Sequence, residues 1–279
     1  MDILNPKTHL NLPVFVHLPL ILNPDGQGKL SKRQQSASVD FYKQEGFLPE
    51  AILNYLSNIV WNHPEGKEVY SLEEFIKLFK ISDLQNKGAR FDLSKLEWMN
   101  GEYIRGLSDE ELTKRLQEFL VDLSDGALAK SDYPAKDKIL KVVPLIKERI
   151  KKLSDFVPLT NFIFQKPEYD LAEFKKIKIE NVKEVLEKIR ESLDTMKKPW
   201  NAETFEKTFR DMVEKLKIPA REMFQLIRLA VSGQLVTPPL FDSIELIGED
   251  EVLNRVKELA TIYPKISDSS EDLSLKEKD

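Results

Sequence analysis

The chain has 279 residues, with 42 lysines and arginines against 47 aspartates and glutamates, so its formal net charge is only -5. This charge excludes a strongly basic protein, and a hydrophobic content of 41% is enough to bury a core, which argues against disorder throughout. Cysteine is absent and the three histidines (His9, His17 and His63) are far apart in the sequence, so disulfides, thiol catalysis and a zinc cluster are not expected.

The sequence also lacks the usual signs of a membrane or secreted protein. No apolar run approaches the about 20 residues that a membrane-spanning helix requires. The first residues do not show the basic and then apolar pattern of a signal peptide. We therefore expect a cytoplasmic, monomeric protein without a structural metal.

Residues 1–28 are extended and interrupted by prolines. The apolar runs at residues 14–16 and 20–22 predict short strands. The sequence Asp25-Gly26-Gln27-Gly28 then predicts a turn, because glycine adopts backbone angles that other residues resist. This segment is too short to fold alone.

Helical patterns follow this turn. Pro49 predicts the start of a helix, and the apolar residues after it recur on one helical face. These residues are Ile52, Leu53, Leu56, Ile59 and Val60. Ser71, Ser108 and Asn201 are predicted N-caps of three further helices, because short polar side chains can accept a hydrogen bond from the first helical turn.

Pro219 predicts the start of another helix, and Gly233 its end. Beyond residue 29 the sequence shows neither alternating strands and crossover helices nor a repeat of fixed period. We therefore predict a mainly α fold. Candidate domain boundaries lie at Gly106-Leu107 and near Trp200, and the polar composition from about Lys265 predicts a frayed tail.

A basic loop is the sharpest local motif of the chain. In Gly28-Lys29-Leu30-Ser31-Lys32-Arg33, three cations directly follow a glycine turn. Such a loop can bind phosphate, because glycine lets the backbone approach an anion while lysine and arginine neutralise it. On chemistry alone, a solvated basic loop is the competing interpretation.

Residues 29–33 resemble the KMSKS signature loop of class I aminoacyl-tRNA synthetases, and the preceding segment from Val14 to Gly26 is similar to that of bacterial-type glutamyl-tRNA synthetases. Three later blocks resemble the same family in the same order. They are Phe91 to Arg105, Val142 to Ser154, and Arg228 to Phe241. The resemblance covers residues from about 13 to 260.

The resemblance implies a domain order and a fold. Residues 1–28 correspond to a remnant of the nucleotide-binding catalytic domain, and residues 29–107 to the signature loop and a stem-contact domain with some strand. Residues 108–199 and 200–264 correspond to two all-helical anticodon-binding domains, followed by a polar tail at 265–279. The HIGH signature and the nucleotide-binding half that precede the loop in this family are missing, so we expect this chain alone not to activate glutamate.

The resemblance also implies roles for the loop. Lys32 is expected to contact ATP and to neutralise charge that builds on the phosphates while glutamate attacks the α-phosphorus. Lys29 and Arg33 are expected to support the loop or to touch the acceptor end of the tRNA. The implied ligands are ATP, with magnesium as its counter-ion, L-glutamate and tRNA(Glu); zinc is not expected.

RNA binding by the helical part requires a local basic face and not a basic protein. One cluster of cations is either such a face or an ordinary solvated helix surface. It comprises Lys141, Lys147, Arg149, Lys151 and Lys152. Arg221 and Arg228 are seven residues apart and lie on one helix face. We take Arg149, Arg221 and Arg228 as candidate tRNA contacts, because arginine can hydrogen-bond and stack on unpaired bases.

Several aromatic residues have structural interpretations. Trp98 and Tyr103 are expected in the core, and His17 is expected to be packed against apolar neighbours. His63, which precedes Pro64, is expected in a loop. Two functions remain open: part of a glutamate-tRNA ligase, or a stand-alone tRNA-binding or interaction protein derived from that family without ligase activity.

Overall fold

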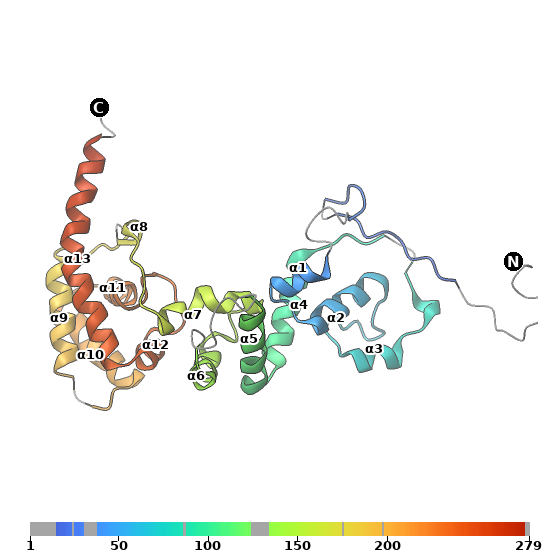
Figure 1. Cartoon of the computed structure of the whole chain (residues 1–279), viewed down its shortest axis with the longest axis horizontal. Coiled ribbons are helices and arrows are strands. Elements are labelled where there is room, and N and C mark those ends of the chain that lie inside the picture. Colours follow the sequence, from blue (N-terminus) through green and yellow to red (C-terminus); the bar gives the residue numbers. More distant parts are fainter. Residues whose placement is uncertain are drawn as a thin grey trace, which may run out of the picture. The chain divides into compact units, whose positions relative to one another are not determined.

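The computed structural model describes residues 15–23, 25–30, 38–85, 88–123, 134–174, 176–196 and 198–276, with the backbone alone for 171–172 and 264–276. The chain divides into two compact units, Met1–Tyr103 and Ile104–Asp279. Nearly all regular structure in the described residues is helical (Figure 1), so the prediction of a mainly α fold is confirmed. Of the helices in the described part of the chain, none is both long enough and apolar enough to span a membrane.

The first unit consists of short helices and a small β arrangement. Its helices are α1 (Val39–Gln44), α2 (Pro49–Val60), α3 (Leu72–Leu78), the 3-10 helix η2 (Ile81–Asp83) and α4 (Leu93–Gly106), which continues past the division of the units. Leu22 pairs with Lys29 in an antiparallel bridge and with Arg90 in a parallel bridge. The predicted strand at 20–22 is therefore present only as this local pairing, within the described residues.

The predicted strand at residues 14–16 is not formed over its described part. Phe15 and Val16 have no regular secondary structure and are exposed, at 70% and 47%. In the described part of this segment, backbone pairing begins only at Ile21, which accepts a hydrogen bond from the Leu30 N–H. An apolar run forms a stable strand only where a neighbouring strand takes up its N–H and C=O groups.

The buried face of α2 differs from its apolar stripe. Leu53 and Leu56 are exposed, at 49% and 40%, whereas Asn54 and Ser57 are buried. The two polar residues can be buried because each is hydrogen-bonded to groups around Tyr70. The periodicity of apolar residues was therefore wrong for Leu53 and Leu56, whereas Ile52 and Ile59 of the predicted stripe do pack against the core.

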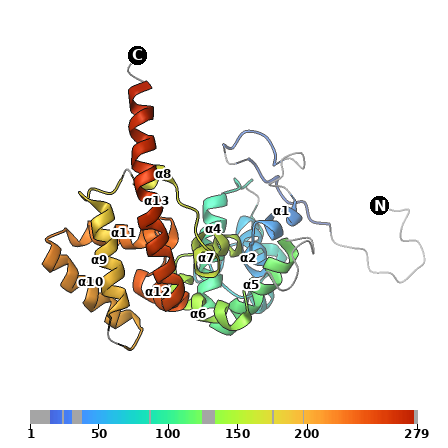
Figure 2. The ribbon, with the colours of Figure 1, turned by 60° about the vertical axis from the view of Figure 1, so that its left-hand side comes forward.

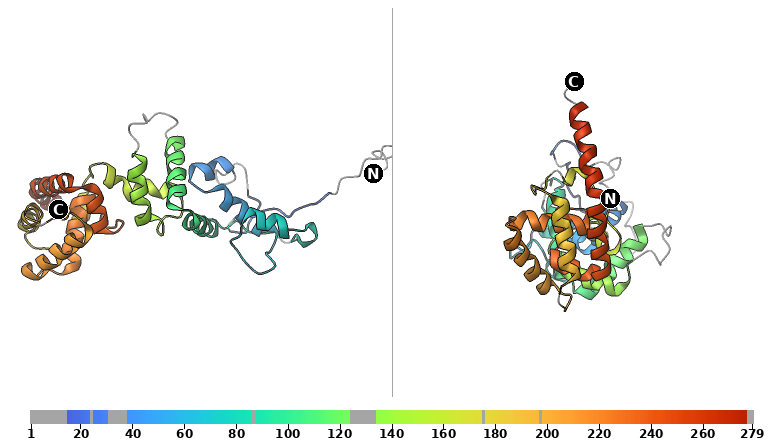
Figure 3. Two further views of the ribbon diagram at one scale, coloured as in Figure 1. Left: turned by 90° about the horizontal axis from the view of Figure 1, so that it is seen from below. Right: turned by 90° about the vertical axis from the view of Figure 1, so that its left-hand side faces the viewer.

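The second unit is an all-helical assembly in the described residues (Figures 1 and 2). In chain order its elements are α5 (Asp109–Leu123), α6 (Lys136–Ile146), η4 (Leu153–Asp155), α7 (Phe156–Phe164), α8 (Leu171–Phe174), α9 (Val182–Asp194), α10 (Ala202–Leu216), α11 (Ala220–Ser232), α12 (Leu240–Ile247) and α13 (Glu249–Lys276). The red helix α13 lies beside the yellow helix α9 (Figure 3), and α5 packs against α6.

The predicted helix ends are largely confirmed. Ser71 accepts a hydrogen bond from the Glu74 N–H at 3.1 Å, and Asn201 accepts one from the Thr204 N–H at 2.9 Å. Ser108 does the same for the Glu111 N–H at 3.1 Å. Local capping chemistry, which depends on residues three apart, could therefore be read directly from the sequence.

The end of α11 requires glycine. Gly233 has a φ of 70°, in the left-handed region, and a Cβ there would lie 2.3 Å from the Glu168 carbonyl oxygen. Any side chain would therefore strain the turn and displace the neighbouring backbone. Pro219 precedes the first helical residue of α11, in agreement with the predicted start.

The core of the second unit joins α9 to the four helices that follow it. Leu186 and Ile189 of α9 belong to the same buried cluster as Phe205, Leu226 and Val256. The boundary expected near Trp200 therefore lies inside a continuous core. The backbone of α13 is helical to Lys276, where a frayed tail was expected.

A buried arginine of α13 forms hydrogen bonds to backbone groups of neighbouring helices. Arg255 is 2% exposed and donates from Nη1 to the carbonyls of Phe162, at 2.7 Å, and Val231, at 2.6 Å. Its Nη2 donates to the Gln165 carbonyl at 3.1 Å, and its Nε to Glu251 at 2.7 Å. The guanidinium thus satisfies carbonyls at the ends of two other helices, α7 and α11.

Candidate functional sites

The signature-like loop begins on the small β arrangement of the first unit. The Leu30 N–H donates to the Ile21 carbonyl at 2.8 Å, and the Leu30 side chain packs against the core around Tyr55 and Phe91. Lys29, one residue earlier, is exposed. The structure thus anchors the start of the loop, whereas Lys32 and Arg33 lie outside the described residues.

The turn before Lys29 is fixed by its own hydrogen bonds. The Asn23 N–H donates to the Gly28 carbonyl at 3.1 Å, and the Gly26 N–H donates to the Asn23 carbonyl at 2.8 Å. The Gln27 N–H donates to Asp25 Oδ1 at 2.8 Å. Gly26 and Gly28 have φ values of 75° and 74°, which confirms the predicted glycine turn.

Two of the candidate RNA-binding arginines lie beside one loop of the second unit. Arg149 follows α6, and its Nη1 donates to the Thr237 carbonyl at 2.8 Å. Arg228 of α11 donates from Nη1 to the Leu235 carbonyl at 3.4 Å, while its buried Nε has no hydrogen-bond partner. Burial, and then the charge of Arg149, lower the pKa of Arg228 from its usual range.

The loop at 233–238 is hydrogen-bonded to the end of α11. Ser232 Oγ donates to the Arg228 carbonyl at 2.6 Å and accepts from the Gln234 N–H at 3.1 Å. Val236 is 74% exposed within this loop. Guanidinium donors next to an exposed apolar side chain suit an unpaired base, which offers polar edges and an apolar face.

Arg221 is separate from this pair. It lies in the first turn of α11 and is exposed, about two helical turns before Arg228. The structure therefore brings together Arg149 and Arg228 and does not bring Arg221 to the same loop. The carbonyls of Leu235 and Thr237 were not predicted from the sequence, because backbone groups carry no residue-type signal.

The lysine cluster after α6 is partly structural. Lys147 Nζ donates to the Leu107 carbonyl and to Asp109 Oδ1, the latter at 3.0 Å, and its side chain is only 17% exposed. The backbone N–H groups of Lys151 and Lys152 both donate to Asp155 Oδ2. Lys147 therefore stabilises the start of α5. Of the cluster, it is the residue least suited to contact RNA.

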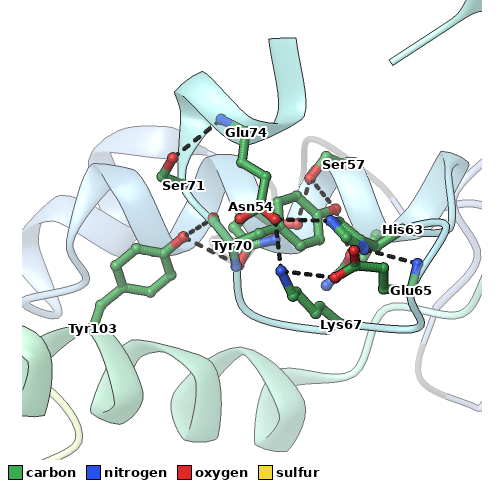
Figure 4. Close-up of polar contacts among 10 residues, drawn as sticks. Asn54, Ser57, His63, Glu65, Lys67, Tyr70, Ser71, Glu74 and Tyr103 are labelled. Atoms are coloured by element: carbon green, nitrogen blue, oxygen red, sulfur yellow. Dashed lines mark hydrogen bonds and ion pairs between the residues drawn. The ribbon is translucent and has the colours of Figure 1, made fainter. Parts of the chain in front are cut away.

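A polar network fixes the loop between α2 and α3 in the first unit (Figure 4). His63 is buried, accepts at Nδ1 from the Glu65 N–H at 3.1 Å, and places Nε2 3.1 Å from Glu74 Oε1. Lys67 Nζ donates to the same Glu74 oxygen at 2.8 Å. Hydrogen bonds from Lys67 first, and also from His63, hold the pKa of Glu74 below its usual range.

The same network reaches α4 through Tyr103. The Tyr103 hydroxyl donates to the Tyr70 carbonyl at 2.6 Å and lies 3.1 Å from Asn54 Oδ1 (Figure 4). Asn54 Oδ1 also accepts from the Tyr70 N–H, and Ser57 Oγ lies 2.8 Å from the Tyr70 hydroxyl. Burial raises the pKa of Tyr103 to about 12. His63 does lie in a loop, as predicted, but its buried role in this network was missed.

Two structural expectations for aromatic residues were wrong. Trp98 is 39% exposed, because Leu96 and Met99 occupy the core side of α4. His17 is exposed and lies in a segment without regular structure, so it is not packed.

Two family models match the chain in succession. The model described as tRNA synthetases class I (E and Q), catalytic domain, matches residues 2–98. The model described as anticodon binding domain matches residues 111–260, which is more than half of the chain. Together the two matches define the class of the protein, a class I aminoacyl-tRNA synthetase.

Individual relatives narrow this class. The glutamate-tRNA ligase 1 of Fervidobacterium nodosum is 35% identical over 245 residues, which cover 88% of this chain and 48% of that protein. The glutamate-tRNA ligase of Dehalococcoides mccartyi is 36% identical over 247 residues, which cover 88% of this chain and 50% of that protein.

A solved structure of a glutamate tRNA ligase is also similar to this chain. The crystal structure of a glutamate tRNA ligase from Elizabethkingia meningosepticum in complex with its amino acid matches with a TM-score of 0.75 at 26% identity. The match covers 90% of this chain and 52% of that chain. The chain belongs to the glutamyl-tRNA synthetase family, and it spans about half the length of the relatives it matches.

Proposed function

We propose that this chain is the C-terminal part of a glutamate-tRNA ligase, which binds the stem and the anticodon of tRNA(Glu) and contributes the signature-like loop to ATP-dependent glutamate activation. The observation that carries this proposal is the succession of a catalytic-domain match at residues 2–98 and an anticodon-binding match at 111–260. Residues 1–28 then belong to the catalytic domain, 29–107 hold the loop and contact the stem, and the helices from residue 108 contact the anticodon.

The proposed chemistry of the loop is electrostatic. When the glutamate carboxylate attacks the α-phosphorus of ATP, a bond forms to phosphorus and pyrophosphate leaves, so negative charge builds on the departing oxygens. Lys32 neutralises that charge, and Lys29 and Arg33 hold the loop or the acceptor end of the tRNA. Magnesium accompanies ATP as its counter-ion. The anchored Leu30 supports this role, because a loop that starts from packed core can position its cations.

An exposed apolar segment supports the idea that another half covers the first unit. Phe15, Leu18 and Leu20 are 70%, 53% and 64% exposed. Apolar side chains that lie close together and remain exposed are typical of a surface that another protein segment covers. The chain spans about half of its relatives, and the half that precedes the loop in them is the proposed cover.

For the anticodon we propose Arg149, Arg221 and Arg228 as contacts. Arg149 and Arg228 lie beside the 233–238 loop, and each donates one hydrogen bond to a carbonyl of this loop. A guanidinium has five N–H donors, so Arg149, which is exposed, keeps donors for base edges or phosphates, whereas Arg228 can offer only those besides its buried Nε. Arg221 extends the basic face toward the start of α11.

Complementation tests the proposal. The nucleotide-binding half of a related glutamate-tRNA ligase is expressed separately and mixed with this chain, and formation of glutamyl-tRNA is measured with each half alone as control. We expect charging only from the mixture. Firm tRNA binding by this chain without any charging in the mixture would instead favour a stand-alone tRNA-binding protein.

A further inference from the structure

A cleft of about 500 Å³ lies in the second unit, where its walls are formed by α6 and α12 and its floor includes a residue of α7. The helix α12 packs against both α6 and α7 (Figure 2). The lining residues of α6, and likewise those of α12, are spaced as neighbours on one helical face. The volume is in the range of pockets that bind small organic ligands.

The two walls of the cleft carry opposite charges. Lys138 and Lys141 line it from α6, and Asp242 and Glu245 line it from α12. Within the described residues, the side chains of Lys138, Lys141 and Asp242 make no hydrogen bond or ion pair. Glu245 Oε2 accepts from the Ala202 N–H at 2.9 Å. The cations of one wall therefore do not neutralise the acids of the other.

The surface between the charged residues is apolar. Val142 and Ile163 are buried, and Leu145 and Leu246 are partly buried. Such a surface favours contact with hydrocarbon over contact with water. A bare phosphate gains nothing from it, and the acids of α12 repel the phosphates of RNA. The ligand that fits has a carboxylate and an ammonium group at opposite ends of an apolar chain.

We propose that this cleft binds an ω-amino acid, in which a methylene chain separates the carboxylate from the ammonium group. The carboxylate binds Lys138 and Lys141, the ammonium group binds Asp242 and Glu245, and the methylene chain lies over the apolar surface. A lysine at the C-terminus of a polypeptide has the same chemistry, so the test includes both sources. None of the lining residues is a proposed tRNA contact, and the inference does not rest on the proposed function.

Amide NMR of the full chain, titrated with ε-aminocaproate, tests the site directly. We expect the amides of Val142, Leu145, Ile163 and Leu246 to shift with a Kd of about 1 mM, because each exposed ion pair contributes little. Caproate and hexylamine carry one charge each, so each should bind about fivefold more weakly. The shorter γ-aminobutyrate should also bind more weakly than ε-aminocaproate, because it covers less of the apolar surface.

Variants of the two walls separate the two charges. Lys141→Gln and Asp242→Asn should each weaken binding of ε-aminocaproate about fivefold. Binding of caproate should respond to Lys141→Gln alone, and binding of hexylamine to Asp242→Asn alone. Lys136→Gln is the matched control, because Lys136 is an exposed cation of α6 that does not line the cleft. Its loss should change the affinity less than about twofold.

A short peptide that ends in lysine distinguishes the two sources. It is titrated with a free C-terminal carboxylate and, as its control, with an amidated C-terminus. Tighter binding of the free-acid peptide than of ε-aminocaproate assigns the site to a C-terminal lysine of a protein, and weaker binding assigns it to a free ω-amino acid. The proposal is overturned by the absence of shifts at about 20 mM ε-aminocaproate, by equal affinity for ε-aminocaproate and caproate, or by unchanged affinity in Asp242→Asn.

Discussion

Arg149 Nη1 donates a 2.8 Å hydrogen bond to the carbonyl oxygen of Thr237, which is 88 residues away in the sequence. This bond joins the turn after α6 to the loop before α12. The bond orients the Arg149 side chain, and within the described residues it uses one of the five N–H donors of the guanidinium. Such preorientation lowers the entropy cost of binding a ligand.

Arg149→Gln should weaken binding of tRNA(Glu) about tenfold, because it removes a charged fork of the kind that reads base edges or phosphates. The expected measurement is a fluorescence anisotropy titration. Arg210→Gln is the control, because Arg210 is an exposed arginine of the same unit that is paired with Glu206; this variant should bind within twofold of the wild type. Equal losses in both variants would show a general effect of charge and no site at Arg149.

Arg255→Met should lower the free energy of unfolding of the second unit by about 3 kcal/mol, because the carbonyls of Phe162, Gln165 and Val231 lose their donor in a buried place. Urea unfolding followed by signals of this unit measures the change. Arg210→Met, at an exposed site, should cost less than about 0.5 kcal/mol. A decrease of less than about 1 kcal/mol in the free energy of unfolding of Arg255→Met would mean that water replaces the guanidinium as the hydrogen-bond donor to these carbonyls.

Tyr103→Phe should make the stability of the first unit less sensitive to high pH. Burial first, and nearby Tyr70, Glu50 and Glu73 next, raise the pKa of Tyr103 to about 12, so the folded state favours the neutral phenol. That contribution is fully present below the unfolded-state pKa of about 10 and is lost as pH rises through about 12.

Urea unfolding of the wild type and Tyr103→Phe at a series of pH values between neutral and strongly alkaline checks this prediction. The difference between the two proteins should be constant up to the pH where an unfolded tyrosine ionises, and should shrink above it. Some alkaline loss will remain in Tyr103→Phe, because burial also raises the pKa of Tyr42 to about 12. A difference that grows with pH would contradict the assigned direction.

Lys32→Ala should slow adenylate formation in the reconstituted enzyme roughly 100-fold, because a cation that acts on the developing charge affects rate more than binding. Affinity for tRNA should stay within twofold of the wild type. The check is single-turnover kinetics together with a tRNA binding titration. Parallel loss of rate and affinity would contradict the role proposed for Lys32.

Helix ends were predictable from the sequence because their chemistry is local. Ser71, Ser108 and Asn201 each cap a helix through an N–H three residues ahead. The same holds for the glycine turn, since Gly26 and Gly28 adopt the left-handed angles that their residue type permits. In each case the sequence signal and the hydrogen bond lie within a few residues of each other.

Long-range features were not predictable in this way. The buried face of α2 carries Asn54 and Ser57, whose oxygens lie within hydrogen-bonding distance of Tyr70 and Tyr103, residues at distant positions of the chain. The pairing of Arg149 with the Thr237 carbonyl involves a backbone group, which no residue pattern reveals. The sequence therefore indicated the arginines of the candidate site, but it did not indicate the loop whose carbonyl groups orient them.

Affinity of the chain for tRNA(Glu), compared with the same tRNA carrying a replaced anticodon, tests the central claim most directly. We predict that the native tRNA binds, that the replaced anticodon weakens binding about tenfold, and that log Kd for the native tRNA rises linearly with log salt concentration. Equal affinity for both tRNAs, or binding that does not respond to salt, would contradict the proposal that these helices recognise the anticodon.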